Sequence, residues 1–334
     1  MIVVESFVVG ITLCVLTMIC WGSHANTLKM IPKTYAFPLY YWDQAFGYLL
    51  LPLIVGLTLG SFGSSGRSLL QDFSQASTSS YGMACLGGFV FNLANILFTS
   101  AIAIAGMAVA FPIGIGIALV EGVIINYIAK PGGNPVLLFT GVTLITAAIV
   151  LDAMAYRRLK AESETSDTTK GIVLALVGGI LMGLFYYIVQ RSLSADFRHL
   201  ESGKFGPYAA VVVFAAGSLV SNLIFNTYLM AKPFTGEPVK FSAYTAKGTF
   251  RPHLIGLLGG MINGTGTTSN IVASHVVSPA IAYGLGQGAT MVAAIWGIFV
   301  WKEFRAAPKG TNLMIAAMFL LFVTGLSLLI IAKL

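Results

Sequence analysis

Charged residues are scarce in this chain of 334 residues, because Asp, Glu, Lys and Arg together make up only 9% of it. A soluble globular domain carries roughly 25% charged residues, which keep its surface in water. Hydrophobic residues make up 57% of the chain, and its mean hydropathy is +0.85. The basic residues behind the net charge of +7 are scattered between apolar runs and form no stripe for a nucleic acid. This composition excludes a soluble enzyme and a nucleic-acid-binding protein, and it predicts an integral membrane protein surrounded by lipid.

Cysteine is also scarce, and Cys14, Cys20 and Cys85 all lie inside apolar runs. They therefore form no secreted disulfide framework and are expected to be small buried hydrophobic residues. The amino end lacks the positive charge and the A-x-A-like site of a secretory signal, so its apolar run is expected to be the first membrane helix. The glycines at 284, 286 and 288 follow no strand and indicate close helix packing, not a phosphate-binding loop. We expect neither a cofactor nor a metal.

Long apolar runs dominate the chain. A helix needs about 20 mostly apolar residues to cross the hydrocarbon core, whereas a membrane β-barrel would show alternating segments of about 10 residues. We predict an all-α integral membrane fold with ten transmembrane helices, at 6–28, 37–60, 81–105, 106–129, 134–156, 171–191, 206–231, 253–276, 278–301 and 310–333.

The two halves of the chain share a pattern of glycine, asparagine and lysine. Gly87-Gly88 with Asn95 is followed by a Gly-x-Gly and by Lys130, and Gly259-Gly260 with Asn263 is followed by the same features and by Lys302. Five spans in each half would insert the second copy upside down, as in many secondary transporters. We therefore predict two inverted five-helix repeats, at 1–156 and 171–334, joined by a linker at 157–170.

Lys and Arg residues are unequally divided between the two ends of the predicted bundle. Thirteen of the 19 fall on the side of the 157–170 linker, and six fall on the side of the termini. The richer side is expected to be cytoplasmic. The prediction is a multi-pass protein of the inner or plasma membrane, with both termini outside the cytoplasm, as a monomer or a homodimer.

Two carboxyl groups lie well inside predicted spans. Asp43 is about two turns into the second span, and Glu121 is near the centre of the fourth. An ionisable group in hydrocarbon faces a partner or a wet cavity, and apolar surroundings disfavour its charged form. We expect Asp43 and Glu121 to couple proton movement to transport. The alternative is that each carboxyl group only ties two helices together.

Uncharged polar side chains follow the faces of several predicted helices. The eighth span is the most polar, because Asn263, Thr267 and Asn270 belong to six polar residues within eight positions. Such groups suit a neutral solute with several hydrogen-bonding atoms, although helix-to-helix bonding is the alternative for a lone residue. Tryptophans that lie deep within a span could stack on a flat ring of the solute. The candidate substrate ligands are Trp21, Trp42, Gln44, Asn92, Asn95, Asn263, Thr267, Asn270 and Gln287. A His24–Asp43 proton relay is a further possibility, and His199 and His253 are expected in loops.

Several short stretches, in order along nearly the whole chain, resemble the ureide permease family of the drug/metabolite transporter superfamily, which also contains glucose/ribose and rhamnose porters. These stretches are Met1–Ser6, Tyr41-Trp-Asp43, Gly87-Gly88 with Asn95, Ile125-Asn-Tyr127, Leu138-Phe-Thr-Gly-Val142, Gly256-Leu-Leu-Gly-Gly260 with Asn263-Gly264, and Ile295-Trp-Gly-Ile-Phe299 with Lys302-Glu-Phe304. The resemblance implies five plus five helices and proton-linked uptake of small oxo-heterocycles such as allantoin, uracil or xanthine. It places family-like residues at Asp43, Asn95, Asn126, Asn263 and Trp296.

The chain departs from that family at two places. The 157–170 linker is short and lacks the Gly-rich motif of the plant members, and Phe111 stands near the place of a family-typical acidic residue, while Glu121 appears further along. The predicted function is import of a small neutral polar metabolite, best a ureide or nucleobase, by proton symport. The alternatives are a proton-linked monosaccharide porter, a passive channel or drug exporter, and an intramembrane enzyme such as an aspartyl protease, for which Asp43 lacks a partner motif.

Overall fold

The computed structural model describes residues 1–159, 168–234 and 236–334. Helices account for all the regular structure there, apart from one isolated bridge between Leu193 and Phe205. The elements are α1 (Phe7–Ser23), the 3₁₀ helix η1 (His24–Met30), α2 (Phe37–Leu57), α3 (Leu69–Gln75), α4 (Thr78–Ala105), α5 (Met107–Ala110), the π-helical turn η2 (Phe111–Ile115), α6 (Gly116–Ala129), α7 (Pro135–Leu159), α8 (Thr168–Gln190), α9 (Pro207–Ala231), α10 (Ser242–Lys247), α11 (Phe250–Val277), α12 (Pro279–Gly286), α13 (Ala289–Ile295), the π-helical turn η3 (Trp296–Val300) and α14 (Thr311–Ile331).

Eight helical segments of the described residues are long and apolar enough to cross a membrane. They are Phe7–Met30, Thr78–Ala105, Phe111–Ala129, Pro135–Leu159, Thr169–Gln190, Pro207–Ala231, Pro279–Val300 and Thr311–Ile331. The other two predicted spans correspond to α2, with 21 residues, and α11, with 28 residues. Both are long enough to cross the bilayer but are more polar, because α2 contains Asp43 and Gln44 and α11 contains a run of asparagine, threonine and serine.

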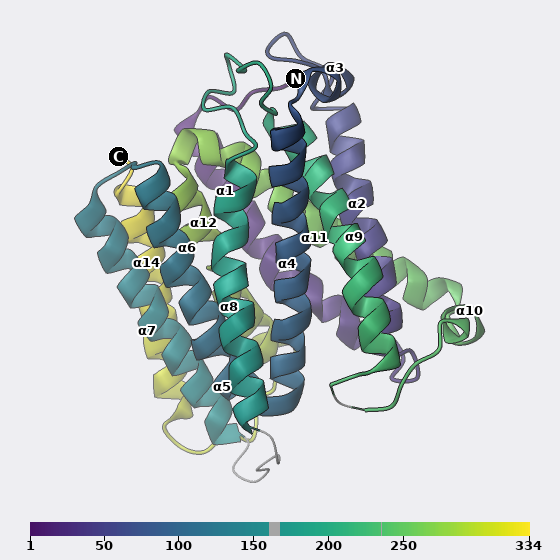
Figure 1. Ribbon diagram of the computed structural model, residues 1–334. Coiled ribbons are helices and arrows are strands. Elements are labelled where there is room, and N and C mark those ends of the chain that lie inside the picture. The colour runs from purple at the N-terminus through teal and green to yellow at the C-terminus, as the bar shows by residue number, and fades with distance from the viewer. Residues whose placement is uncertain (160–167, 235) are drawn as a thin grey trace.

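The helices pack as one bundle in which distant parts of the chain are neighbours (Figure 1). Helix α4 packs on α8 and α9, and α11 packs on α1 and α2. Helix α7 packs on α14, and α2 packs on α9. Aromatic rings of Tyr48, Phe91, Phe185, Phe214 and Tyr283 meet in the buried core between these pairs.

The two ends of the bundle carry different short elements. We call side A the end with both chain termini and α3, and side B the end with η1, α10 and residues 301–310 (Figure 1). The terminal ammonium of Met1 donates to the Ser65 carbonyl at 2.6 Å, and Asn134 N donates to the Ala332 carbonyl at 2.6 Å. The short helices α3 and α10 lie within stretches that the sequence pattern treats as plain links between spans.

Glycine makes the closest helix contacts possible. A methyl group at Gly88 of α4 would overlap the carbonyl oxygen of Phe214 on α9, and one at Gly260 of α11 would overlap that of Gln44 on α2. Small residues of this kind let membrane helices approach at backbone distance, where lipid offers no hydrophobic drive for association. The Gly-Gly pairs of the sequence are therefore contact points between helices.

Candidate transport site

Asp43 lies near the side B end of α2, where four elements surround its carboxyl group. The side chain is only 5% exposed. Tyr35 Oη donates to Oδ2 at 2.9 Å, Tyr244 Oη on α10 donates to Oδ1, and His253 Nδ1 lies 2.9 Å from Oδ1 and 3.1 Å from Oδ2. The structure thus pairs Asp43 with His253, which lies in the first turn of α11 and not in a loop as predicted. His24 instead bonds the Trp21 carbonyl through Nδ1 at 2.9 Å.

The two tyrosines beside Asp43 keep their protons. Burial, with the neighbouring Asp43 charge, raises the pKa of Tyr35, which precedes α2. Burial and the hydrogen bond to Asp43 likewise raise the pKa of Tyr244 on α10. Both hydroxyl groups are therefore donors toward the carboxylate, and hydrogen bonds to an ionised acceptor are stronger than neutral ones.

Thr267 lies at the meeting point of α1, α2 and α11. Its hydroxyl accepts from Trp21 Nε1 at 3.2 Å and from Tyr48 Oη at 2.8 Å. The Trp21 ring packs on the backbone at Gly266 and Gly286, which bring α11 and α12 against its two edges. Two residues chosen from the sequence, Trp21 and Thr267, are therefore in contact in the middle of the bundle.

The other polar candidates on α11 and α12 lie near this contact. Asn270 donates through Nδ2 to the Ala282 carbonyl at 2.8 Å, while its Oδ1 is buried with no partner among the described residues. Asn263 is buried one turn before Thr267 on α11, and Gln287 follows α12 directly. An unpartnered buried acceptor is costly in apolar surroundings, so Asn270 Oδ1 is a free hydrogen-bonding position facing the interior.

Four more candidates lie on α2 and α4. Asn92 accepts from Tyr41 Oη at 3.0 Å and donates to Ser221 Oγ at 3.3 Å, which joins α4 to α2 and α9. Asn95 donates to the Phe91 carbonyl of its own helix at 2.9 Å. Trp42 is buried at side B, where its Nε1 lies 3.3 Å from Met230 Sδ, and so it is not grouped with Trp21. Gln44 is buried beside it on α2.

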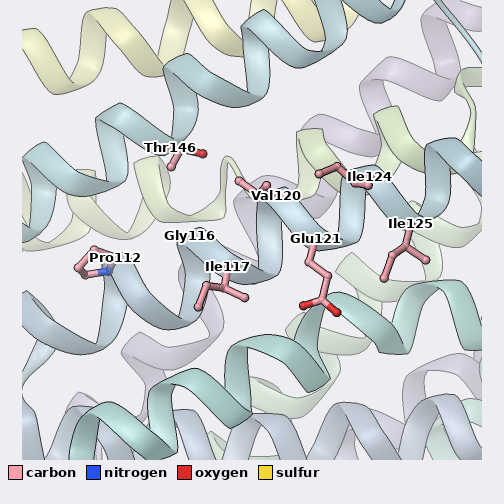
Figure 2. Close-up of a pocket in the computed structure, with 8 residues that line it drawn as sticks. All are labelled: Pro112, Gly116, Ile117, Val120, Glu121, Ile124, Ile125 and Thr146. Atoms are coloured by element: carbon pink, nitrogen blue, oxygen red, sulfur yellow. The ribbon is translucent and has the colours of Figure 1, made fainter. Parts of the chain in front are cut away.

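Glu121 lines a separate apolar hollow of about 570 Å³ on α6, together with residues of η2 and α7 such as Pro112 and Thr146. Figure 2 shows its carboxyl group pointing from α6 toward the neighbouring helix, and the backbone of Gly183 on α8 lies against it. No hydrogen bond or ion pair reaches this carboxyl group from the described part of the chain. Asp43 does not line this hollow, because α2 presents it to side B while α6 presents Glu121 to α8.

A polar hollow of about 250 Å³ opens at side A between the ends of α6 and α8 and the segment that follows α8. Lys130 crosses it to the Ala195 carbonyl at 3.0 Å, and Lys204 reaches the Arg191 carbonyl at 2.7 Å. Gln190 extends from it toward α11, where Nε2 donates to Ser274 Oγ at 3.1 Å. One side chain of this hollow, that of Gln190, is therefore joined to the side A end of α11.

Sequence reasoning did not single out a second group of carboxyl residues at side B. Asp152 of α7 is buried and interacts electrostatically with Glu303. Glu303 accepts from Tyr156 Oη at 2.8 Å and from Lys29 Nζ at 2.6 Å. Asp152 lies near the end of a span and close to arginines, so it resembles an interfacial residue in the sequence, and its proximity to Glu303 is not encoded locally.

Comparison with known proteins agrees with this architecture. A sequence profile of the ureide permease family matches residues 155–332. Ureide permease 1 of Arabidopsis thaliana is 24% identical over 346 residues, which cover 86% of this chain and 87% of that protein. The glucose uptake protein GlcU of Bacillus subtilis (strain 168) is 25% identical over 242 residues, covering 70% of this chain and 75% of that protein.

A protein of known crystal structure shares the fold, with a TM-score of 0.59 and 16% identity over 97% of each chain. The family profile covers more than half of the sequence, and the family's curated relatives align with most of it. This chain is a multi-pass membrane transporter that belongs to the ureide permease family.

Proposed function

We propose that this protein is a proton-coupled secondary transporter that imports a small neutral oxo-heterocycle of the ureide or nucleobase type. It would work by alternating access between two inverted halves. The observation that supports alternating access most directly is that the contacts between helices keep their pattern when the two halves of the chain are exchanged. α1 with α8, α2 with α9, α4 with α11 and α7 with α14 are the matched pairs under that exchange.

The exchange can be followed through individual contacts. Helix α4 packs on α8 and α9 as α11 packs on α1 and α2. In the pairs α2 with α9 and α7 with α14, each helix packs on its own match. Gly88 approaches Phe214 as Gly260 approaches Gln44, and one offset along the chain relates Gly88 to Gly260 and Gly106 to Ser278.

The matched residues Gly106 and Ser278 share an unusual backbone conformation. Gly106 has φ 77° and Ser278 has φ 90°, and each joins two helices with no intervening loop. Positive φ is uncommon for a residue other than glycine, so its recurrence at Ser278 supports a repeated structure. With α2 and α11 counted as spans, each half has five helices, and an odd number inverts the second half in the bilayer.

The repeats would extend over 1–156 and 171–334, and most of the 157–170 linker lies outside the described residues. Side B holds Lys29, Arg157, Arg158 and Lys302, among other basic residues. By the charge rule it faces the cytoplasm, which places both termini on the outside of the inner or plasma membrane. The hollow at side A would then be the entrance for imported solute.

Substrate binding is assigned to the contact region of α1, α2, α11 and α12. Trp21 offers a ring face, Thr267 and Asn263 offer uncharged polar groups, and Asn270 Oδ1 offers an unused acceptor. A ureide ring presents alternating N–H and C=O groups, which pair with amides and hydroxyls without any fixed charge. Proton coupling is assigned to Asp43 and Glu121. The similarity to GlcU supports a monosaccharide as the second candidate cargo.

The test is uptake of radiolabelled solutes by proteoliposomes that contain the full chain. The panel contains allantoin, uracil, xanthine, glucose and ribose, with an imposed pH gradient, with no gradient, and with a protonophore. We expect accumulation of an oxo-heterocycle that requires the gradient and is competed by its analogues but not by sugars. Accumulation of a sugar alone would favour the second candidate. Uptake of no panel member above protein-free liposomes would contradict the proposal.

A further inference from the structure

The cluster around Asp43 includes a histidine, His253, whose role is not yet assigned. We propose that His253 relays protons between side B and Asp43, and that the proton on Asp43 releases α10 from the bundle. This inference rests on the proposed proton-coupled transport. We call the contact of Tyr244 with Asp43 the α10 latch.

His253 has the geometry of a relay because its two ring nitrogens face different surroundings. Nδ1 lies within hydrogen-bonding distance of both carboxyl oxygens of Asp43 and 3.2 Å from Tyr35 Oη. Nε2 lies against Gly248 in the link between α10 and α11, with no hydrogen bond to it within the described residues. The His253 side chain is 28% exposed whereas that of Asp43 is 5% exposed, so His253 is the member of this pair that is more open to water.

The charge of Asp43 has no permanent counter-charge in this cluster. The titratable groups that face it from the packed elements are Tyr35, Tyr40, Tyr244 and His253. The Tyr40 hydroxyl is engaged with Thr27 Oγ1 at 2.6 Å, and no Lys or Arg of the described residues forms an ion pair with Asp43. Histidine is the only one of these side chains that ordinarily titrates between pH 5 and 8.

The α10 latch holds a helix that makes few other contacts with the bundle. Helix α10 contains no buried residue and has no side-chain cap at its N-terminus. The Tyr244 ring packs at 4.5 Å from the His253 ring and stacks at 5.6 Å on Phe241, which meets Trp42 edge-on at 6.0 Å. The hydroxyl bond to Asp43 is therefore the main polar link between α10 and the transmembrane helices.

The proton movements of the relay balance as follows. While Asp43 is ionised it accepts from Tyr244, and side B is closed. A proton bound at Asp43 Oδ1 removes the negative charge, so the charge-assisted bond from Tyr244 becomes a weaker neutral hydrogen bond and α10 loosens. His253 in its Nε2–H tautomer then takes this proton at its vacant Nδ1, and the imidazolium so formed gives its Nε2 proton to water at side B. Exchange of the ring protons with water returns His253 from the Nδ1–H to the Nε2–H tautomer before the next cycle. The restored carboxylate accepts from Tyr244 again and closes the latch.

The decisive variant is His253→Asn, because the asparagine amide can donate near the position of Nδ1 but cannot transfer a proton through the ring. We expect gradient-driven accumulation of the solute to fall at least tenfold. Exchange of internal for external solute, which moves no net proton, should stay within twofold of wild type. His199→Asn is the matched control, since His199 is 87% exposed at side A and pairs only with Asp196, and it should leave both measurements unchanged.

A second variant tests the latch independently of transport. Tyr244→Phe removes the hydroxyl and keeps the ring. In a Thr27→Cys background, where residue 27 is buried against Tyr40 of the Asp43 cluster, we expect maleimide labelling to increase severalfold in Tyr244→Phe. Because maleimide reacts with the thiolate, each rate is divided by that of the same variant denatured at the same pH. This ratio should rise in the Thr27→Cys single variant as the pH falls, and the parent chain gives the background from its own cysteines.

The outcomes separate this inference from the function on which it rests. Wild-type protein that exchanges solute but does not accumulate it under a pH gradient would contradict the proposed proton coupling and the relay with it. Wild-type accumulation that survives in His253→Asn would overturn only the relay. Thr27→Cys labelling that is unaffected by pH and by Tyr244→Phe would overturn only the latch.

Discussion

The two short helices α3 and α10 occupy matched positions at opposite ends of the molecule, and they are held by different chemistry. α3 follows α2 at side A, and α10 follows α9 at side B (Figure 1). Asp72 of α3 accepts from Arg67 Nε at 3.0 Å and from Gly206 N at 2.6 Å. Tyr244 of α10 donates to the Asp43 carboxylate, which has His253 as its neighbour.

The two caps differ in whether their charged groups can change protonation near neutral pH. Arg67 keeps its charge at any physiological pH and also donates to the carbonyls of Leu200, Glu201 and Lys204. The capping box of Ser68 and Gln71 fixes the start of α3 as well. A histidine and a carboxyl group, by contrast, can pass a proton between them. Under the proposed relay, side A therefore has a fixed cap and side B has a pH-responsive one.

The largest difference between the two caps is expected in the coupling of solute uptake to the pH gradient. Asp43→Asn should abolish pH-gradient-driven accumulation and leave solute exchange, because an amide cannot carry a proton but can still accept from Tyr244. Asp72→Asn is the matched variant and should retain coupling. The measurement is the ratio of gradient-driven uptake to exchange in proteoliposomes. Unchanged accumulation in Asp43→Asn would remove this residue from the coupling role.

The second expected effect is on stability at side A. Burial raises the pKa of Asp72, and Arg67 and the Gly206 amide oppose that rise. Arg67→Met would leave a buried carboxyl group without its cation. We expect a loss of about 2–3 kcal/mol in the free energy of unfolding, below the ~3–5 kcal/mol of fully buried pairs, because Arg67 is 22% exposed.

This loss would appear as a lower denaturation midpoint in detergent. Arg198→Met is the control, because its pair with Asp196 is 4.0 Å long and about half exposed, and it should change the unfolding free energy by less than about 1 kcal/mol. Equal midpoints for the two variants would argue against a fixed cap at α3.

A smaller effect is expected between the caps, at the proposed substrate contacts. Thr267→Val removes the hydroxyl that bonds Trp21 and Tyr48 and should raise the KM for the solute about threefold to tenfold, which corresponds to ~1 kcal/mol for one hydrogen bond. Thr143→Val is the control on α7, where the hydroxyl bonds its own helix at the Phe139 carbonyl. A KM that Thr267→Val leaves at the wild-type value would exclude Thr267 from the site.

The smallest expected effect concerns Glu121, which belongs to neither cap. If it shares in coupling, Glu121→Gln should shift the pH optimum of uptake while accumulation persists. Glu201→Gln at the side A hollow is the comparison variant. A pH profile of Glu121→Gln identical to that of wild type would restrict coupling to the Asp43 cluster.

Much of the architecture was predictable from local patterns. Eight predicted spans correspond to helices that are apolar enough to cross a membrane. The predicted spans 81–105 and 106–129, and 253–276 and 278–301, nearly adjoin, and the helices there meet at Gly106 and Ser278 with no loop. The short helix α10 was not predicted, because its six residues lack apolar periodicity. The position of Asp43 in α2 was predictable, but its partner His253 was assigned to a loop, since a polar run obscures the start of α11.

The sequence alone determined that the chain is a helical membrane protein, because the length and apolarity of its runs match the thickness of a bilayer. It also indicated which buried polar residues call for an explanation. Only the tertiary structure decided their partners: Asp43 with His253 and Tyr244, Trp21 with Thr267, and Asp152 with Glu303. These contacts join residues far apart in the chain, and helix packing, which no local pattern specifies, sets the distances between them.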